Sequence, residues 1–135
     1  THYTEAALAE LADVIRNEPI DFVQLPYSIG VRDAEREILP LAADKGVAVI
    51  VNRPFEGGGL FRARSRKPLP GIAKELGIGS WGQLFLKYAL GHPAVTCVIP
   101  GTSNPHHIAD NLAAGTGHVP DTALHAELPR VARGD

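Results

Sequence analysis

A chain of 135 residues has room for one domain with a sizeable core, and its formal charge of -2 argues against nucleic acid or an anionic membrane as the main partner. No apolar run approaches the length of a membrane span and no signal peptide is visible, so we expect a cytoplasmic protein. The single cysteine, Cys97, cannot form an internal disulfide and lies in an apolar run, where we expect it to be buried. The sequence contains no methionine, and we expect it to be part of something larger.

The first part of the chain alternates between helical and strand patterns. Thr4 is expected to cap a helix whose apolar residues recur at helical spacing. The apolar run Ile20–Leu25 predicts the first strand. Asp33 is expected to cap a second helix that ends at Gly46, and Pro40 inside it should kink the helix or confine its regular part to one side.

A second strand and a long loop follow. Val47–Val51 is unbroken in apolarity and predicts a strand, and the loop from Asn52 to Pro70 is longer than most loops in a compact domain. Three consecutive glycines at 57–59 would allow a ligand to approach the backbone closely, or would allow the loop to move as a hinge. The loop also holds the most basic part of the chain, Arg62, Arg64, Arg66 and Lys67. A solvated, mobile loop tip and an anion-binding lid explain this composition equally well.

The clearest helix-start signals lie in the second half of the chain. Ser80 and Gln83 form a capping box before a longer helix. The run Val95–Ile99 predicts a strand buried on both faces, and Asn104 with Pro105 predicts a helix directly after it. A strand end, a polar turn and a helix N-terminus together suit an anion such as phosphate, although an ordinary capped helix also explains these residues.

Three apolar runs, each followed by a helical pattern, predict a single α/β domain with adjacent parallel strands in chain order. The carboxyl ends of the strands, marked by Pro26, Asn52 and Pro100, should lie at the same edge of the sheet. Only a weak helix near Ala123–Leu128 is expected in the final part, residues 116–135, which should be loosely ordered. Phosphate binding after the last two strands is typical of the eight-stranded α/β barrel, which needs about 250 residues.

Four stretches of the sequence resemble a known family. They are DFVQLPYS (Asp21–Ser28), ILPLAADKGVAVIVNRPFEGGGL (Ile38–Leu60), GQLFLKYAL (Gly82–Leu90) and VIPGTSNPHHIADN (Val98–Asn111). In this order they are similar to the carboxyl-terminal portion of the aldo/keto reductase family. The resemblance implies that residues 1–135 form the carboxyl-terminal half of a TIM-type (β/α)8 barrel, with the three strands as its sixth, seventh and eighth.

The same resemblance implies an NADP(H)-dependent carbonyl reductase, with NAD as the alternative cofactor. Gln24 would contact the nicotinamide carboxamide together with Thr1 and His2, and Asn52 would lie beside the nicotinamide ring. The segment Arg53–Leu60 would cover the pyrophosphate, and the residues that follow the third strand would bind the adenosine end with its 2′-phosphate. The implied cofactor-binding residues are Thr1, His2, Gln24, Asn52, Arg53, Pro54, Gly57, Leu60, Gly101, Thr102, His107 and Asn111.

Two of these positions depart from the family pattern. Gly101 stands where many members have a lysine, and His107 stands where they have an arginine. Both changes weaken a charged contact with the 2′-phosphate, because a neutral histidine is a poorer phosphate partner than a guanidinium. A preference for NADP over NAD therefore stays open.

The resemblance places no catalytic residue in this chain. The family's catalytic tyrosine, aspartate, lysine and histidine lie in the first half of the barrel. Of the tyrosines present, we interpret Tyr88 as a packing residue on a helix, and only Tyr27 follows a strand end. No set of spaced ligands predicts a metal site.

Two interpretations of the chain follow from this absence. The chain is either the cofactor-binding part of a reductase that acts on a small carbonyl compound, or a non-catalytic half-barrel that binds or oligomerises. Both interpretations need a partner surface, either the missing barrel half or a second copy, because open sheet edges are a liability in isolation.

Overall fold

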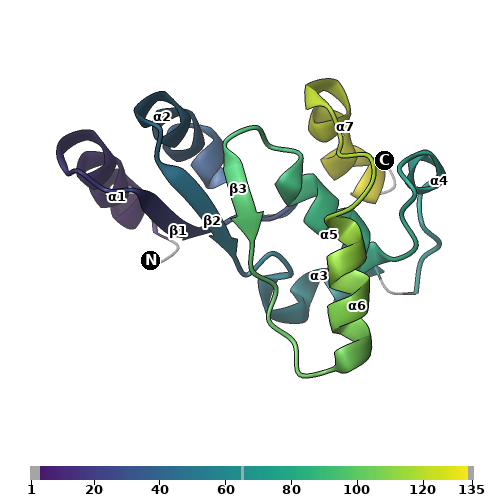
Figure 1. Ribbon diagram of the computed structural model, residues 1–135. Coiled ribbons are helices and arrows are strands. Elements are labelled where there is room, and N and C mark those ends of the chain that lie inside the picture. The colour runs from purple at the N-terminus through teal and green to yellow at the C-terminus, as the bar shows by residue number, and fades with distance from the viewer. Residues whose placement is uncertain (1–3, 65, 134–135) are drawn as a thin grey trace.

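The computed structural model describes residues 4–64 and 66–133, and at its centre three parallel strands form one sheet (Figure 1). The strands are β1 (Phe22–Pro26), β2 (Ala48–Asn52) and β3 (Val95–Val98), in the order β1-β2-β3. The predicted adjacency and parallel direction are confirmed. Pro26 pairs with Asn52, so the carboxyl ends of β1 and β2 lie side by side.

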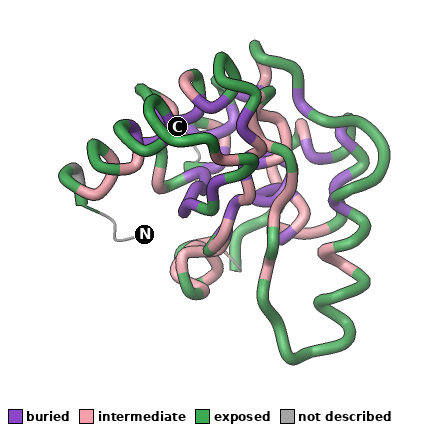
Figure 2. The backbone as a smooth tube through the Cα atoms, turned by 60° about the vertical axis from the view of Figure 1, so that its left-hand side comes forward, coloured by how far each residue is buried: buried purple, intermediate pink, exposed green. Residues whose placement is uncertain are grey.

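Helices and short turns connect the strands and cover one face of the sheet, leaving the other face open (Figure 1). The main core lies between that face and the helices, and Figure 2 shows buried residues gathered there. In chain order the helical elements are α1 (Glu5–Asn17), η1 (Asp33–Glu35), α2 (Ile38–Lys45), η2 (Glu56–Gly58), α3 (Gly59–Arg64), α4 (Ile72–Glu75), α5 (Trp81–Leu90), α6 (Pro105–Ala114) and α7 (Thr122–Arg133).

The strands are buried on one face rather than on two, which corrects the prediction from their apolar sequences. Along β1 the exposed Phe22 and Gln24 alternate with the buried Val23 and Leu25. In β3 no residue is fully buried, and Cys97, predicted to be a core residue, is half-buried. The reason is topological: within the described part of the chain β3 pairs only with β2 and forms an edge of the sheet.

Three of the four predicted helix caps are confirmed. The Thr4 side chain accepts a hydrogen bond from the N–H of Ala7 at the start of α1. Ser80 does the same for the N–H of Gln83 at α5, and Asn104 caps α6 with Pro105 as its first residue. Such caps satisfy N–H groups that have no partner inside the helix.

The prediction for Asp33 is wrong. Asp33 begins the short η1 turn, and α2 begins only at Ile38, where no side chain supplies a capping hydrogen bond. Pro40 is therefore the third residue of α2, in the first turn, where its missing N–H has no intrahelical partner to lose. Of the two outcomes expected for Pro40, confinement of the regular helix to one side is the one observed. Gly46 ends α2 as predicted, and its backbone is left-handed.

Two segments contain more helix than the sequence predicted. The loop expected over residues 52–70 contains η2 and α3. The tail expected to be loosely ordered over residues 116–135 contains α7, which is anchored because Leu128 is fully buried and Ala132 nearly so. Among the described residues no helix is long and apolar enough to cross a membrane.

Candidate functional site

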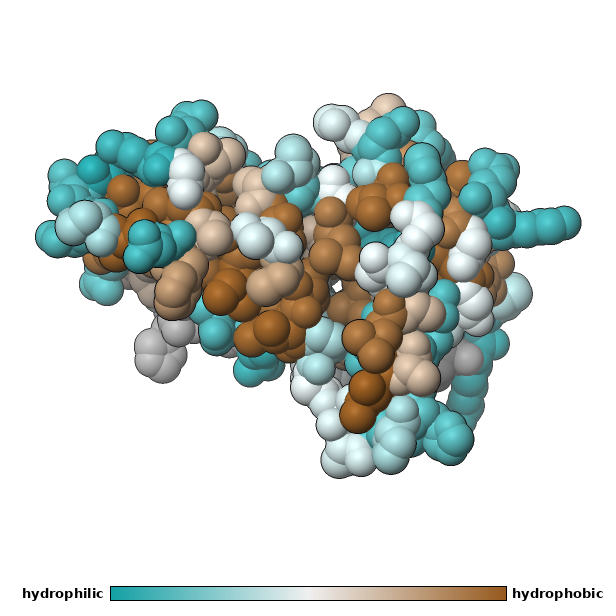
Figure 3. All heavy atoms as spheres, in the orientation of Figure 1, coloured by the Kyte–Doolittle hydropathy of each residue, from teal (hydrophilic) through white to brown (hydrophobic). Residues whose placement is uncertain are grey.

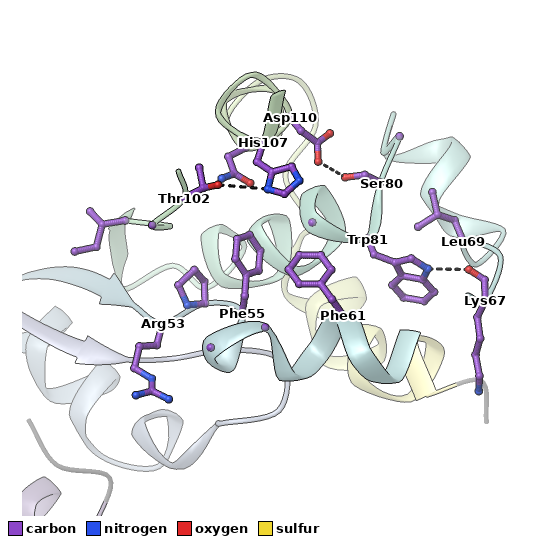
Figure 4. Close-up of a pocket in the computed structure, with 18 residues that line it drawn as sticks. Arg53, Phe55, Phe61, Lys67, Leu69, Ser80, Trp81, Thr102, His107 and Asp110 are labelled. Atoms are coloured by element: carbon purple, nitrogen blue, oxygen red, sulfur yellow. Dashed lines mark hydrogen bonds between the residues drawn. The ribbon is translucent and has the colours of Figure 1, made fainter. Parts of the chain in front are cut away.

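A cavity of about 1030 Å³ opens beyond the carboxyl ends of β2 and β3 (Figure 4). Its walls come from the loop after β2, from α3, from the start of α5 and from α6 with the turn that precedes it. Ligands of parallel α/β proteins bind at the carboxyl ends of the strands, because the loops that vary between proteins converge there. The cavity therefore lies where this class of fold places its functional site.

One side of the cavity is aromatic. Phe55 and Phe61 contact each other with ring centroids 4.9 Å apart, and Trp81 extends this surface. Phe85 lies behind them, 5.6 Å from Phe61 and 5.7 Å from Trp81 between ring centroids. The indole N–H of Trp81 donates to the carbonyl of Lys67, which holds the ring in place. Such a wall suits a flat ring or another apolar surface.

The loop after β2 is built from left-handed backbone conformations. Arg53 and Glu56 have φ angles of 50° and 53°, which are uncommon for residues with a side chain, and Gly57 and Gly58 have φ angles of 63° and 85°. Each such non-glycine residue costs about 1 to 3 kcal/mol and persists only where its surroundings fix it. This conformation curls the chain so that residues on both sides of Glu56 line the cavity.

The opposite edge of the cavity is the polar turn before α6. Asn104 caps the helix by accepting a hydrogen bond from the N–H of His106. The imidazole of His107 lies 3.3 Å from the Thr102 hydroxyl through Nδ1 and 3.4 Å from the Asn104 amide nitrogen through Nε2. A hydroxyl, an imidazole and the N-terminus of α6 thus lie together at this edge, and the N–H groups of His106 and His107 are bonded to Asn104. The anion site stays a prediction.

Hydrogen bonds hold α6 against α5 near this cavity. The Asp110 carboxylate accepts from the Ser80 hydroxyl and from the Gln83 amide, both at 2.6 Å. Farther along α5, the buried Lys87 ammonium donates to the carbonyls of Thr116 and His118, both at 2.7 Å, just after α6 ends. Burial lowers the pKa of Lys87. The wall that carries His107 is therefore fixed at two places.

A buried polar cluster lies apart from the cavity. The hydroxyls of Tyr27 and Tyr88 both donate to the Glu35 carboxylate, at 2.7 and 2.6 Å, and Arg32 forms an ion pair with the same group. Burial alone would raise the pKa of Glu35, but the hydrogen bonds from Arg32, Tyr88 and Tyr27 outweigh it and lower this pKa to about 2. Burial raises the pKa of both tyrosines and lowers that of His125, which contacts Tyr27. The tyrosines are fully buried, so we assign this cluster to the core.

The cavity brings together most of the residues that the family resemblance predicted as cofactor contacts. Gln24 lies on the open face of β1 outside the cavity lining, Asn52 lies at the end of β2 with its Oδ1 buried, and Leu60 packs on the core. Thr1 and His2 lie outside the described residues. The predicted residues that do line the cavity are Arg53, Pro54, Gly57, Gly101, Thr102, His107 and Asn111.

Several lining residues had no signal as site residues in the sequence. No motif marks Trp81 or Phe61 as a site residue, and only the tertiary arrangement shows them facing a cavity. Asp110 gave no signal because its hydrogen-bond partners are 27 and 30 positions away in the chain. Of the basic residues Arg62, Arg64, Arg66 and Lys67 in the predicted loop, Lys67 lines the cavity.

The sequence pattern of the aldo/keto reductase family matches residues 4–126. The chain belongs to the aldo/keto reductase family. A curated relative, the NADH-specific methylglyoxal reductase of Escherichia coli K12, is 27% identical, over 70% of this chain and 37% of its own length.

Solved structures of aldo/keto reductases share the fold of this chain. The aldo-keto reductase AKR11C1 from Bacillus halodurans superposes with a TM-score of 0.68 at 22% identity, over 93% of this chain and 47% of its own. An aldo-keto reductase from Klebsiella pneumoniae in complex with NADPH gives a TM-score of 0.64 at 25% identity, over 82% of this chain and 38% of its own. The chain thus spans less than half the length of these relatives, and its three parallel strands match part of their barrel.

Proposed function

We propose that this chain is the cofactor-binding part of an NAD(P)H-dependent aldo/keto reductase and supplies the last three strands of its barrel. The observation that carries the proposal is the cavity at the strand ends, in which the seven predicted cofactor residues named above converge. When bound, a nicotinamide dinucleotide supplies a hydride for reduction of a small carbonyl compound. The residues of this chain bind and orient the dinucleotide.

The site fits an elongated ligand with a charged middle and two polar ends. The loop that begins at Arg53 offers backbone groups for a pyrophosphate, and the turn around Thr102 offers donors for the adenosine end. At the end of β2, Asn52 Oδ1 is buried and has no hydrogen-bond partner among the described residues. A carboxamide N–H at this position would satisfy the Asn52 oxygen, since buried acceptors without partners are costly.

The choice between NADP(H) and NAD(H) rests on the edge formed by α6. Among the described residues that line the cavity at this edge there is no arginine or lysine; His107 and Thr102 take their place, and the Asp110 carboxylate lies nearby. Both cofactors are found among relatives, since the Escherichia coli protein is named NADH-specific and the Klebsiella pneumoniae structure contains NADPH. We propose that this site binds both and discriminates weakly in favour of the 2′-phosphate.

Catalysis requires groups from outside this chain. The buried hydroxyls of Tyr27 and Tyr88 are hydrogen-bonded to Glu35 and are not accessible to a substrate. A general acid must lie within hydrogen-bond reach of the carbonyl oxygen that it protonates. We therefore propose that a second barrel half supplies the catalytic residues and the remaining substrate contacts.

The exposed apolar surface supports such a partner. Phe22 on β1 is 62% exposed and Leu112 on α6 is 70% exposed, and Ile108 joins Leu112 beside the free edge of β3. Figure 3 shows apolar residues gathered over the sheet and along one side of α6. Strand–helix units that extend the sheet at both edges would cover this surface. A non-catalytic module that oligomerises would use the same surface, and it is the alternative function.

Trp81, the single tryptophan of the chain, lines the cavity and reports on its occupant. We expect NADH and NADPH each to quench Trp81 fluorescence in a saturable titration of the 135-residue chain. His107→Arg should tighten NADPH binding by about tenfold and leave NADH binding nearly unchanged, because the new guanidinium meets only the 2′-phosphate. His106→Arg is the matched control, since His106 is exposed on the same helix but outside the cavity lining. Absence of a saturable response to either dinucleotide would contradict the proposed function.

A further inference from the structure

We propose that Glu56 is a positioning residue that fixes the loop after β2 in its binding conformation by anchoring it to the loop after β1. This inference rests on the proposed function, because the loop concerned is the one that would cover the dinucleotide pyrophosphate. Phe55 and Gly57 line the cavity, whereas the intervening Glu56 faces a second, smaller cavity beside Tyr27. The side chain of Glu56 is therefore directed away from the ligand and toward the neighbouring loop.

Ser28 is the anchor for this carboxylate. Its hydroxyl donates to Glu56 Oε1 at 2.5 Å, and the same oxygen of Ser28 accepts from the N–H groups of Gly30 and Val31 at 3.1 and 2.9 Å. Ser28 is only 1% exposed, so its hydroxyl is fixed by the turn that follows β1. A hydrogen bond to a charged group is stronger than one between neutral groups, particularly where water is partly excluded.

Gly30 leaves the space that the carboxylate occupies. A Cβ atom at this position would collide with Glu56 Oε1, and the backbone of Gly30 is not in the left-handed region. An alanine would therefore keep the backbone of the turn and displace the Glu56 side chain. The space at Gly30 therefore accommodates the same carboxylate oxygen that Ser28 binds.

The anchor explains how the loop holds an unfavourable conformation. Glu56 itself has a φ of 53°, and Arg53, three residues earlier, has a φ of 50°. Both residues lie where side chains are disfavoured, so without an external contact the loop would relax to other conformations. We infer that loss of the Ser28–Glu56 contact does not fill or close the cavity. It lowers the fraction of molecules whose loop is in the binding conformation, and the apparent affinity falls in proportion to that fraction.

The test compares variants of the 135-residue chain in NADH titrations followed by Trp81 fluorescence. Glu56→Ala should raise the Kd by about tenfold, the effect expected for one lost charged hydrogen bond, and Ser28→Ala by at least as much, because it also removes the acceptor of the Gly30 and Val31 N–H groups. The double variant should bind no more weakly than the weaker single variant, because both changes remove the same contact. Glu56→Gln should bind more tightly than Glu56→Ala and more weakly than the wild type, because its amide oxygen still accepts from Ser28 but carries no charge.

Gly30→Ala provides a test that deletes no hydrogen-bonding group. It should weaken NADH binding as Glu56→Ala does, and the matched control Gly71→Ala should not, because a Cβ at Gly71 meets nothing within 4 Å and its backbone is not left-handed. Hydrogen exchange of the amides of residues 57–59 without ligand should be faster in Glu56→Ala than in the wild type. A purely structural role for Glu56 would lower thermal stability without this local change.

The possible failures are distinguishable. A wild-type chain that gives no saturable response to NADH or NADPH overturns the proposed function, and this inference with it. A wild-type chain that binds, with Glu56→Ala and Gly30→Ala binding equally well, overturns the inference alone. Unchanged amide exchange at residues 57–59 in Glu56→Ala also overturns it, whatever the result of the titrations.

Discussion

The imidazole Nε2 of His125 lies 3.1 Å from the phenol oxygen of Tyr27, and the two residues are 98 positions apart in the sequence. The single phenol proton of Tyr27 is directed to the ionised Glu35 carboxylate, so His125 must donate its Nε2 proton to the phenol oxygen. The hydrogen-bond network thereby assigns the neutral Nε2–H tautomer to His125. This contact connects α7 to the loop that follows β1.

We expect the protein to lose stability as the pH falls below about 6.5, the ordinary histidine value. Burial lowers the pKa of both His125 and His92, so the unfolded chain takes up protons at a higher pH than the folded chain does. Stability is then complete above the unfolded pKa and declines as the pH falls toward the folded values. Thermal unfolding from pH 7.5 to 5.5 should show this slope, and His125→Phe, which keeps the stacking on Tyr88, should make it shallower. An unchanged slope in His125→Phe would contradict the assignment.

Glu35 should contribute to stability through its charge. Its pKa is lowered to about 2 in the folded chain, so its contribution is complete above the ordinary value of about 4.5 and is lost as the pH falls toward 2. Glu35→Gln should lower the free energy of unfolding by about 1 to 3 kcal/mol at pH 7, because three donors lose a charged acceptor. Urea unfolding measures this difference. Glu18→Gln, an exposed change of the same charge, should have little effect.

The 135-residue chain should not reduce carbonyl compounds with NADPH. Neither buried tyrosine reaches a substrate, and the cavity lining among the described residues holds no general acid beside a lysine and an aspartate arranged as its partners. A spectrophotometric assay with an aromatic aldehyde should show no loss of NADPH absorbance above background. Addition of a complementing barrel half should restore turnover. Turnover by the purified chain alone would contradict the proposed division of labour.

The isolated chain should self-associate at micromolar concentration. Both edges of the described sheet lack a further strand, and Phe22 and Leu112 are exposed apolar residues. Sedimentation velocity should therefore show species larger than the monomer, and Leu112→Glu should shift the distribution toward the monomer. A compact wild-type monomer with a sharp thermal transition would argue against the need for a partner surface.

The turn before α6 should bind phosphate weakly. The donors are the hydroxyls of Thr102 and Ser103, because the N–H groups of His106 and His107 already bond to Asn104. The helix N-terminus itself favours an anion by about 0.3 to 1 kcal/mol. NMR titration with adenosine 2′,5′-bisphosphate measures this binding. If the amides of residues 102–107 do not move, Asn104 is only an ordinary cap.

Local signals in the sequence predicted most of the elements of this fold. The caps at Thr4, Ser80 and Asn104 depend on side chains that act within four residues, so they could be recognised without knowledge of the fold. The prediction for Asp33 was wrong because it also relied on local signals alone. A capping residue followed by helical spacing does not show that the short η1 turn comes before α2. The apolar residues of β3 likewise could not show that this strand lies at the edge of the described sheet. Its sequence is as apolar as that of a strand with neighbours on both sides.

The candidate site was predicted less completely, because only part of it follows motifs. Arg53, Pro54, Gly57, Gly101 and Thr102 belong to stretches that resemble a known family, and they line the cavity. Trp81 and Asp110 reach it through the packing of α5 against α6, which no local pattern encodes. The carboxylate of Glu56 and the space at Gly30 also meet only in three dimensions.

The two walls of the cavity differ in how they can respond to ligands of different size. The wall formed by α5 and α6 is fastened near one end by Asp110 and at the other by Lys87, so the two helices should move as one body. The facing wall is a short loop that the Glu56 carboxylate ties to the loop after β1. Complexes with bulky and with small ligands should therefore superpose closely over α5 and α6 and differ at residues 53–59. Changes designed to alter the size of the accepted ligand therefore belong in that adjustable wall rather than in α5 or α6.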